Sequence, residues 1–271
     1  MSFYDLDPVS ETYRDAGKRV EIALQNEYLG EFLDYFVKSA KKGDVRSVLD
    51  VGCGAGAITN EVRRKLGKDG ISFVGVDLSP TQIKNARDDL ADIGNLSFAV
   101  SSGDRLPFAD GAFDIVYETS ALTWSRDPRA FINEMVRVSG NLVAFHAGVT
   151  PSGGESYACI FGWVRRDGPN IEPQFTPSDY GIDELYPRHL VPTDKKGLLQ
   201  YPVSVQKFTY LSEKDFSEIV DGGGIEVLYK KVQGGSHTAM KRQDGVEGPP
   251  TKSDLVFQER FSSRCIVARK V

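Results

Sequence analysis

The residues with the clearest chemical meaning form the stretch VLDVGCGAG, from Val48 to Gly56. An apolar run leads into glycines at three alternate positions, Gly52, Gly54 and Gly56. Glycine lets the backbone turn tightly and lets a ligand approach where a Cβ would otherwise stand. The spacing differs from the G-x-G-x-x-G of dinucleotide-binding turns. It therefore favours an uncharged or zwitterionic group lying across the turn over a pyrophosphate.

Two carboxylates follow at the ends of the next two strand-like segments. Asp77 is placed to accept hydrogen bonds from both hydroxyls of a ribose. Asp104 is placed to accept one from the exocyclic amine of adenine, with Leu106 and Phe108 as apolar faces for the ring. Each feature alone also fits a plain turn or a solvated charge. Their coincidence at three successive strand ends indicates a nucleoside site.

Alternating strands and helices must position these residues. Short segments rich in β-branched and aromatic residues predict buried strands at 45–51, 72–78, 96–100, 113–117 and 142–145. Helices are predicted between them. Ser79-Pro80 and Asp127-Pro128 each supply a capping residue and a proline at the first helical position, and Gly94 and Gly140 are the expected ends. This alternation predicts a parallel sheet with its ligands at the carboxyl ends of the strands.

The helices and strands of the remaining chain are less regular. An amphipathic helix is predicted around Phe32 and Phe36, before the first strand. Residues 150–208 hold seven prolines without clear periodicity, which predicts a long insertion. Ser212 is expected to cap a helix ending at residues 222–224. Strands are predicted at 225–232 and 264–271, with a mobile loop at 234–250 between them.

The composition is that of an ordinary soluble globular protein, with 40% apolar and 26% charged residues. A net charge of −5 counts against nucleic acid as a partner. No apolar run reaches the roughly 20 residues that span a bilayer. The N-terminus has no secretory signal, so a cytoplasmic location is expected. The three cysteines and three histidines show no metal-ligand spacing, and no metal is expected.

The segments VLDVGCGAG, VGVDLSP and GDRLPFADGAFDIVYETSAL resemble the successive motifs of class I S-adenosylmethionine-dependent methyltransferases. The resemblance is to the group that includes quinone and natural-product enzymes. It implies an α/β, Rossmann-like sheet of seven mostly parallel strands, with the last strand antiparallel and helices on both faces. The predicted insertion after the fifth strand is a departure from the family pattern. The expected organisation is an N-terminal lid and helix at 1–43, a cofactor-binding core at 44–149, an insertion or acceptor lid at 150–208, and the rest of the core at 209–271.

The resemblance also implies which residues hold S-adenosylmethionine. Gly52, Gly54 and Gly56 would line its methionine part, Asp77 its ribose and Asp104 its adenine. Neighbouring positions complete the candidate set, with Tyr13 as a lid residue and Trp124 beside the sulfonium: Tyr13, Asp50, Leu78, Gly103, Arg105, Glu118, Thr119 and Trp124. The chain departs from the family pattern at residues 137–141, which lack the usual basic-proline-glycine-glycine turn.

Methyl transfer needs a general base only when the nucleophile carries a proton that must leave. His146 follows the predicted fifth strand and is the candidate base. Glu118 ends the predicted fourth strand and is the second catalytic candidate. The alternatives are a buried histidine that donates to a backbone carbonyl and a Glu118 carboxylate that accepts a purely structural hydrogen bond.

The expected reaction is methylation of an O or N atom of a small, ring-containing metabolite, with S-adenosylhomocysteine as the product of the cofactor. An RNA or protein acceptor is the alternative within the class. A nicotinamide-dependent oxidoreductase and a catalytically silent binding module are alternatives of other classes. The oligomeric state stays open, with a homodimer among the arrangements considered.

Overall fold

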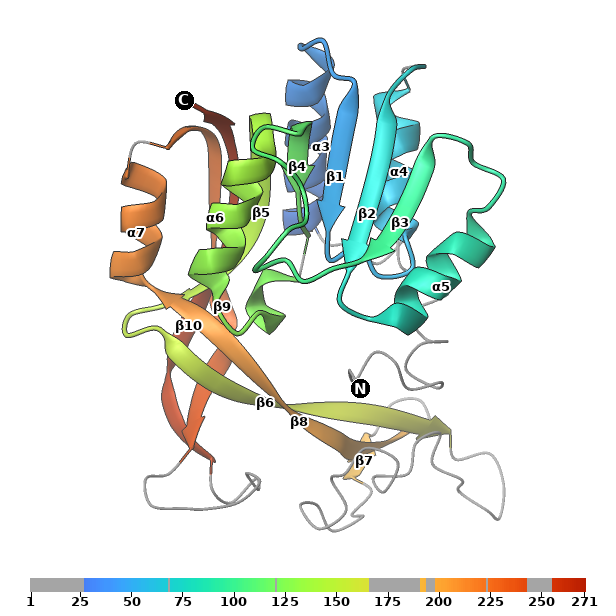
Figure 1. Cartoon of the computed structure of the whole chain (residues 1–271). Coiled ribbons are helices and arrows are strands. Elements are labelled where there is room, and N and C mark those ends of the chain that lie inside the picture. The colour runs from blue at the N-terminus through green and yellow to red at the C-terminus, as the bar shows by residue number, and fades with distance from the viewer. Residues whose placement is uncertain are drawn as a thin grey trace. The chain divides into compact units, whose positions relative to one another are not determined.

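The computed structural model describes residues 27–67, 69–119, 121–165, 191–193, 198–222, 224–242 and 255–271 (Figure 1). The chain divides into two compact units. The first comprises Met1–Gly154, Thr209–Gly235 and Phe261–Val271, and the second comprises Glu155–Phe208 and Ser236–Arg260. Each unit is described by itself. The sequence-based boundaries at 43, 149 and 208 stay predictions.

The first unit is built on a mostly parallel sheet in the order β3-β2-β1-β4-β5-β10-β9. Strands β1 to β5 are mutually parallel, whereas β10 runs antiparallel to β5 with Cys265 opposite His146. The expected Rossmann-like sheet with an antiparallel last strand is thus confirmed. The strands are β1 (Ser47–Val51), β2 (Ser72–Asp77), β3 (Leu96–Val100), β4 (Phe113–Tyr117), β5 (Ser139–Thr150), β9 (Ile225–Arg242) and β10 (Leu255–Lys270).

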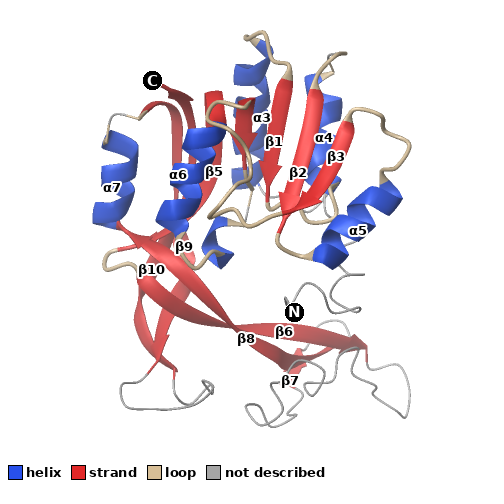
Figure 2. Cartoon of the chain, in the orientation of Figure 1, coloured by secondary structure: helices blue, strands red, loops and turns tan. Residues whose placement is uncertain are grey.

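Helices cover both faces of this sheet, as Figure 2 shows. One face packs against α6 and α7, where Met135 and Phe216 join the core with Phe145 of β5. The other face packs against α3 and α4, where Phe36 contacts Tyr117 with ring centroids 5.0 Å apart. The helices are α3 (Glu27–Lys41), α4 (Ala57–Leu66), α5 (Pro80–Asp89), the 3₁₀ turn η2 (Leu122–Trp124), α6 (Pro128–Val138) and α7 (Glu213–Asp221).

Side-chain caps fix where three helices begin. The oxygens of Ser79, Asp127 and Ser212 accept hydrogen bonds from backbone N–H groups three residues on, at 3.1, 2.9 and 2.9 Å. These starts confirm the sequence prediction. The predicted ends are wrong for two helices, because α5 ends at Asp89 rather than Gly94 and α6 at Val138 rather than Gly140.

The shortened end of α6 explains the missing turn at residues 137–141. Ser139 already belongs to β5, so helix and strand join without a loop. The Lys270 ammonium donates to the carbonyl oxygens of Arg137 and Ser139, at 3.1 and 2.9 Å. A side chain from the last strand thus adds hydrogen bonds to two carbonyls at the junction of helix and strand.

The second half of the chain contains more strand than the sequence predicts. Residues 154–165 form β6, residues 191–193 form β7 and residues 198–212 form β8. Strand β6 pairs antiparallel with β9, and β7 pairs antiparallel with β8. The predicted mobile loop at 234–250 is wrong up to Arg242, because β9 continues to that residue. Glycines and polar residues in these strands hide the alternation that marks a half-buried strand.

Candidate active site

The three glycines after β1 all adopt left-handed backbone conformations, with φ of 82°, 55° and 80°. They serve different purposes. A Cβ on Gly52 would lie 2.1 Å from the Cβ of Ala121, and one on Gly56 would lie 2.8 Å from side chains of Leu90 and Phe98. A Cβ on Gly54 would meet no atom within 4 Å. Packing therefore requires glycine at 52 and 56, whereas Gly54 leaves open space where a ligand can approach.

Asp77 links the ends of β1 and β2. Its Oδ2 accepts a hydrogen bond from the Gly54 N–H and its Oδ1 accepts one from the Ser79 N–H, both at 2.9 Å. The side chain is partly exposed. A carboxylate accepts about four hydrogen bonds, and these two orient the group. The arrangement suits a carboxylate that binds sugar hydroxyls beside the glycine turn.

The loop after β3 carries Asp104, whose Oδ1 accepts a hydrogen bond from the Ser125 hydroxyl at 2.6 Å. Asp104 and the preceding Gly103 are partly buried, and Arg105 is exposed. A Cβ on Gly103 would lie 2.1 Å from the Phe131 ring. Gly103 therefore lets α6 pack closely under this loop, a reason that the sequence pattern does not reveal.

The apolar residues at this edge differ from the sequence expectation. Leu106 is buried in the core and Phe108 packs edge-on against Phe113 at 4.9 Å, so neither is available as a face for a ring. Exposed apolar side chains are found instead at Leu78, 65% exposed, and Val100, 48% exposed. Leu78 follows β2 directly and Val100 is the last residue of β3, so both lie near Asp77 and Asp104. Val100 was missed, although its place as the last residue of a strand was a usable signal.

Asp50 is a buried carboxylate on the sheet face that packs against α3 and α4. Its Oδ2 accepts hydrogen bonds from Thr59 at 2.7 Å and Tyr117 at 2.9 Å. Its buried Oδ1 has no hydrogen-bond partner. Burial raises the pKa of Asp50 to about 7, and the two hydrogen bonds oppose that rise. A buried acceptor without a partner is costly, so this oxygen fits a ligand that brings its own donor, such as an ammonium group.

Glu118 is buried at the end of β4, and its carboxylate binds three backbone amides. Oε1 accepts from the His146 N–H, and Oε2 accepts from the N–H groups of Ala121 and Leu122, at 2.8 and 3.1 Å. Burial raises the pKa of Glu118 to about 7 against the lowering effect of those amides. The carboxylate thus fastens η2 to β5. A direct catalytic or cofactor contact for Glu118 stays a prediction.

His146 lies in β5, and burial lowers the pKa of its imidazole to about 4. The ring is therefore neutral near pH 7 and can accept a proton only weakly, because an efficient base has a pKa near the working pH. Thr119 and Trp124 are partly buried near the same end of β4. Tyr13 lies outside the described residues.

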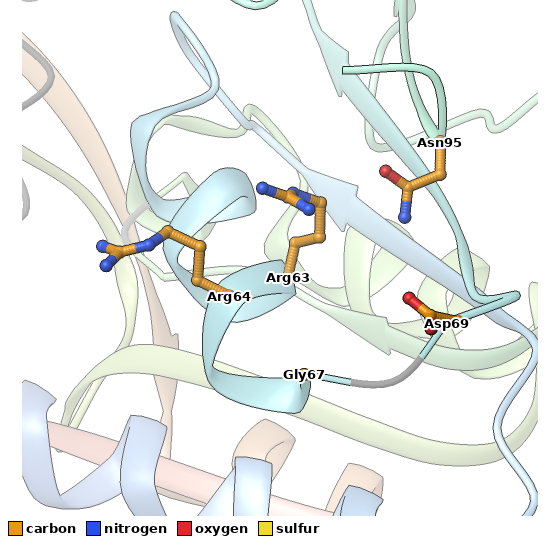
Figure 3. A pocket seen from close by; sticks show the side chains of 5 residues that line it. All are labelled: Arg63, Arg64, Gly67, Asp69 and Asn95. Carbon is orange, nitrogen blue, oxygen red and sulfur yellow. The ribbon is translucent and has the colours of Figure 1, made fainter.

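A polar hollow of about 350 Å³ lies elsewhere. Figure 3 shows the side chains that line it. It is lined by residues from the end of α4 and from the segments before β2 and β3: Arg63, Arg64, Gly67, Asp69 and Asn95. These positions belong to the amino ends of the strands, so the hollow is separate from the residues discussed above. In the described part of the chain no group of three or more His, Cys, Asp or Glu residues could hold a metal ion. None of the described helices is long and apolar enough to cross a membrane.

The fold and the residues at the carboxyl edge of the sheet indicate the class of protein. Residues 49–141 match the methyltransferase domain family, and the match spans the glycine turn, Asp77, Asp104 and Glu118. This match confirms the expected similarity to class I S-adenosylmethionine-dependent methyltransferases over this segment.

Individual relatives share the same part of the chain. Ajmaline N-methyltransferase of Rauvolfia serpentina is 31% identical over 151 residues, which are 52% of this chain and 51% of that protein. The chloroplastic tocopherol O-methyltransferase of Arabidopsis thaliana is 33% identical over 51% of this chain and 39% of its own length. This chain therefore spans about half or less of these curated relatives. A solved S-adenosylmethionine-dependent methyltransferase from Aquifex aeolicus has a TM-score of 0.48 at 16% identity, covering 98% of this chain and all of the other.

Proposed function

We propose that this protein transfers a methyl group from S-adenosylmethionine to an O or N atom of a small, ring-containing acceptor, leaving S-adenosylhomocysteine. The observation that carries the proposal is the open space at Gly54 beside the Asp77 carboxylate. Two further features support it. The unpartnered Asp50 oxygen suits the ammonium of the methionine part, and exposed Leu78 and Val100 suit the faces of an adenine.

The proposed cofactor contacts follow the order of the strands. Asp77 accepts from the ribose hydroxyls at the end of β2, and Asp104 accepts from the adenine amine after β3. The glycine turn after β1 borders the methionine part. The proposed set also includes Tyr13, Gly103, Arg105, Thr119 and Trp124. The three backbone amides that Glu118 binds favour a positioning role for its carboxylate over a cofactor contact.

The bound cofactor supplies an electrophilic methyl on a sulfonium, so the residues of this chain have mainly to orient the acceptor and exclude water. A neutral His146 accepts a hydrogen bond from an acceptor hydroxyl and holds its oxygen in line. With a pKa of about 4, the imidazole removes the proton only as the methyl transfers, not beforehand.

The small-molecule acceptor is supported by the relatives, whose names specify N-methylation of ajmaline and O-methylation of tocopherol. The net charge of −5 disfavours an RNA acceptor, and the glycine spacing disfavours a nicotinamide cofactor. A cytoplasmic location and a homodimer belong to the same proposal. Light scattering at several protein concentrations measures the oligomeric state.

Calorimetric titration with S-adenosylmethionine, S-adenosylhomocysteine and NADH tests the cofactor. We expect the first two to bind and NADH not to bind. Asp77→Ala should weaken both by about 100-fold or more, because it removes charge-assisted hydrogen bonds to the sugar. Asp69→Ala, in the polar hollow at the opposite edge, is the matched control and should bind normally. Binding of NADH alone, or normal affinity in Asp77→Ala, would refute the proposal.

A further inference from the structure

Strand β5 extends beyond its neighbour β4, and the end of β8 occupies the place beside it. The last residue of β4 pairs with Ala144, whereas β5 continues to Thr150. In this extension Val149 lies opposite Leu211 of β8, in parallel register. Tyr210 therefore lies beside Gly148. A Cβ on Gly148 would be 2.5 Å from the Tyr210 ring, so the ring occupies the space that a side chain at 148 would fill.

The turn η2 connects this place with the glycine turn after β1. Ala121 lies over Gly52, and the methyl of Thr123 would be 3.0 Å from a Cβ on Gly148. In the sheet, β4 alone separates β1 from β5, and Gly148 lies two residues further along the strands than Gly52, so the two sites are about 12 Å apart. That is the reach of a small ring-containing molecule. The Glu118 carboxylate holds η2 and β5 in this arrangement through three backbone amides.

The side chains gathered here carry no charge near neutral pH. His146 and Gly148 are two residues apart in one strand and so face the same side of the sheet. Burial lowers the pKa of His146 to about 4 and raises that of Tyr210 to about 12. Both rings are therefore neutral, and both lie in surroundings that penalise an ion.

We infer that His146, Gly148, Tyr210 and Thr123 form the acceptor surface, and that it takes an uncharged ring packed against the Tyr210 side chain. This inference rests on the proposed function and names its substrate class. Aromatic packing and the exclusion of water stabilise a neutral ring on such a surface, whereas an ionised group would lose its hydration and would find no opposite charge on these four residues. Tyr210 is a specificity-determining residue, and Glu118 is a positioning residue that acts through η2 and the His146 backbone.

Binding of three probes of similar size tests the charge preference. The protein, saturated with S-adenosylhomocysteine, is titrated at pH 7 with 2-naphthol, with 2-naphthoate and with 1-naphthylmethylammonium. We expect 2-naphthol to bind about tenfold or more tightly than either ion, because each ion must be desolvated. Equal binding of all three probes, or preference for an ion, would overturn the inference.

Variants then locate the binding surface. Tyr210→Leu removes the Tyr210 ring and Gly148→Ala displaces it, so each should weaken the binding of 2-naphthol about tenfold. Tyr210→Phe keeps the ring and should bind nearly as the parent does. Gly94→Ala is the matched control, because a Cβ there meets no atom within 4 Å. Unchanged 2-naphthol affinity in both Tyr210→Leu and Gly148→Ala would show that the surface is elsewhere.

The titration with S-adenosylhomocysteine separates this inference from the function on which it rests. If that ligand fails to bind the parent protein, the proposed function is wrong. If it binds with the same affinity to the parent, Tyr210→Leu and Gly148→Ala, those variants are folded and their cofactor site is intact. A loss of 2-naphthol binding then reports on the acceptor surface alone.

Discussion

The two halves of the carboxyl edge of the sheet use carboxylates in opposite ways. In the proposed cofactor half, formed by the ends of β1, β2 and β3, Asp77 and Asp104 are partly exposed and each accepts a hydrogen bond from the protein. In the proposed acceptor half, formed by the ends of β4, β5 and β8, Glu118 is buried and its oxygens bind backbone amides. One half presents acceptors to a ligand, and the other uses its carboxylate to hold the backbone in place.

This difference matches what methyl transfer asks of each half. A cofactor with a sugar, a purine amine and an ammonium group offers many donors, and fixed acceptors recognise them. An acceptor molecule must chiefly be aligned with the methyl group and kept from water, which neutral side chains do without competing charges. The comparison predicts that substitutions should affect the two halves separately.

The largest effect is expected in the glycine turn. Gly52→Ala places a Cβ 2.1 Å from Ala121 in a left-handed conformation, so it should lower the free energy of unfolding by about 2–5 kcal/mol. Gly54→Ala meets no protein atom and should cost about 1–2 kcal/mol from its backbone alone. Gly54→Ala should nevertheless weaken the binding of S-adenosylhomocysteine, because the new alanine methyl fills space that the ligand needs. Urea unfolding and calorimetry measure both quantities, and normal cofactor affinity in a folded Gly54→Ala would contradict the assignment.

The cofactor half was predictable from the sequence because its signals are local. The glycines, Asp77 and the Ser79 cap lie within or next to the elements that position them, so spacing alone gave their places. The acceptor half was not predictable, because Tyr210 meets Gly148 through pairing of β5 with β8, far apart in the chain. The same limit explains Leu106 and Phe108, whose burial depends on α6 packing under their loop.

The second-largest effect is a dependence of the free energy of unfolding on pH, which we expect from His146. Its pKa is lowered from 6.5 to about 4 in the folded protein, so the unfolded chain binds more protons between those values. Stability from this residue is therefore complete above pH 6.5 and is lost as the pH falls toward 4, by at most about 3 kcal/mol. In His146→Gln this loss should be absent. Asp50 and Glu118 titrate in both the parent and His146→Gln, so the difference between their free energies of unfolding in urea, measured against pH, isolates His146. If the two pH profiles were parallel, the burial of His146 would be contradicted.

Glu118→Gln should disturb the acceptor half while sparing the cofactor half. One carboxylate oxygen becomes an NH₂ group facing backbone donors, which should cost about 1–3 kcal/mol of stability. We expect 2-naphthol to bind about fivefold more weakly, with S-adenosylhomocysteine affinity within about twofold of the parent. Gly67→Ala, at the left-handed end of α4 and at the opposite edge of the sheet, is a control for destabilisation of about 1 kcal/mol elsewhere. A matching loss of 2-naphthol in that control would mean that stability alone explains the effect.

The smallest effect is expected from Ser125→Ala, which removes the hydroxyl that orients Asp104. The carboxylate stays in place but gains rotational freedom, so its bond to the adenine amine should weaken by about 0.5–1 kcal/mol. The measurable result is selectivity: the preference for S-adenosylhomocysteine over S-inosylhomocysteine, which lacks that amine, should fall about threefold. Ser97→Ala, on the same strand as Val100 but nearer its amino end, should leave the preference unchanged. Ser125 follows directly after η2, so it could instead affect the acceptor half. If Ser125→Ala changed the affinity for 2-naphthol and left the purine preference unchanged, this serine would belong to the acceptor half, and the proposed boundary between the cofactor and acceptor halves would be wrong.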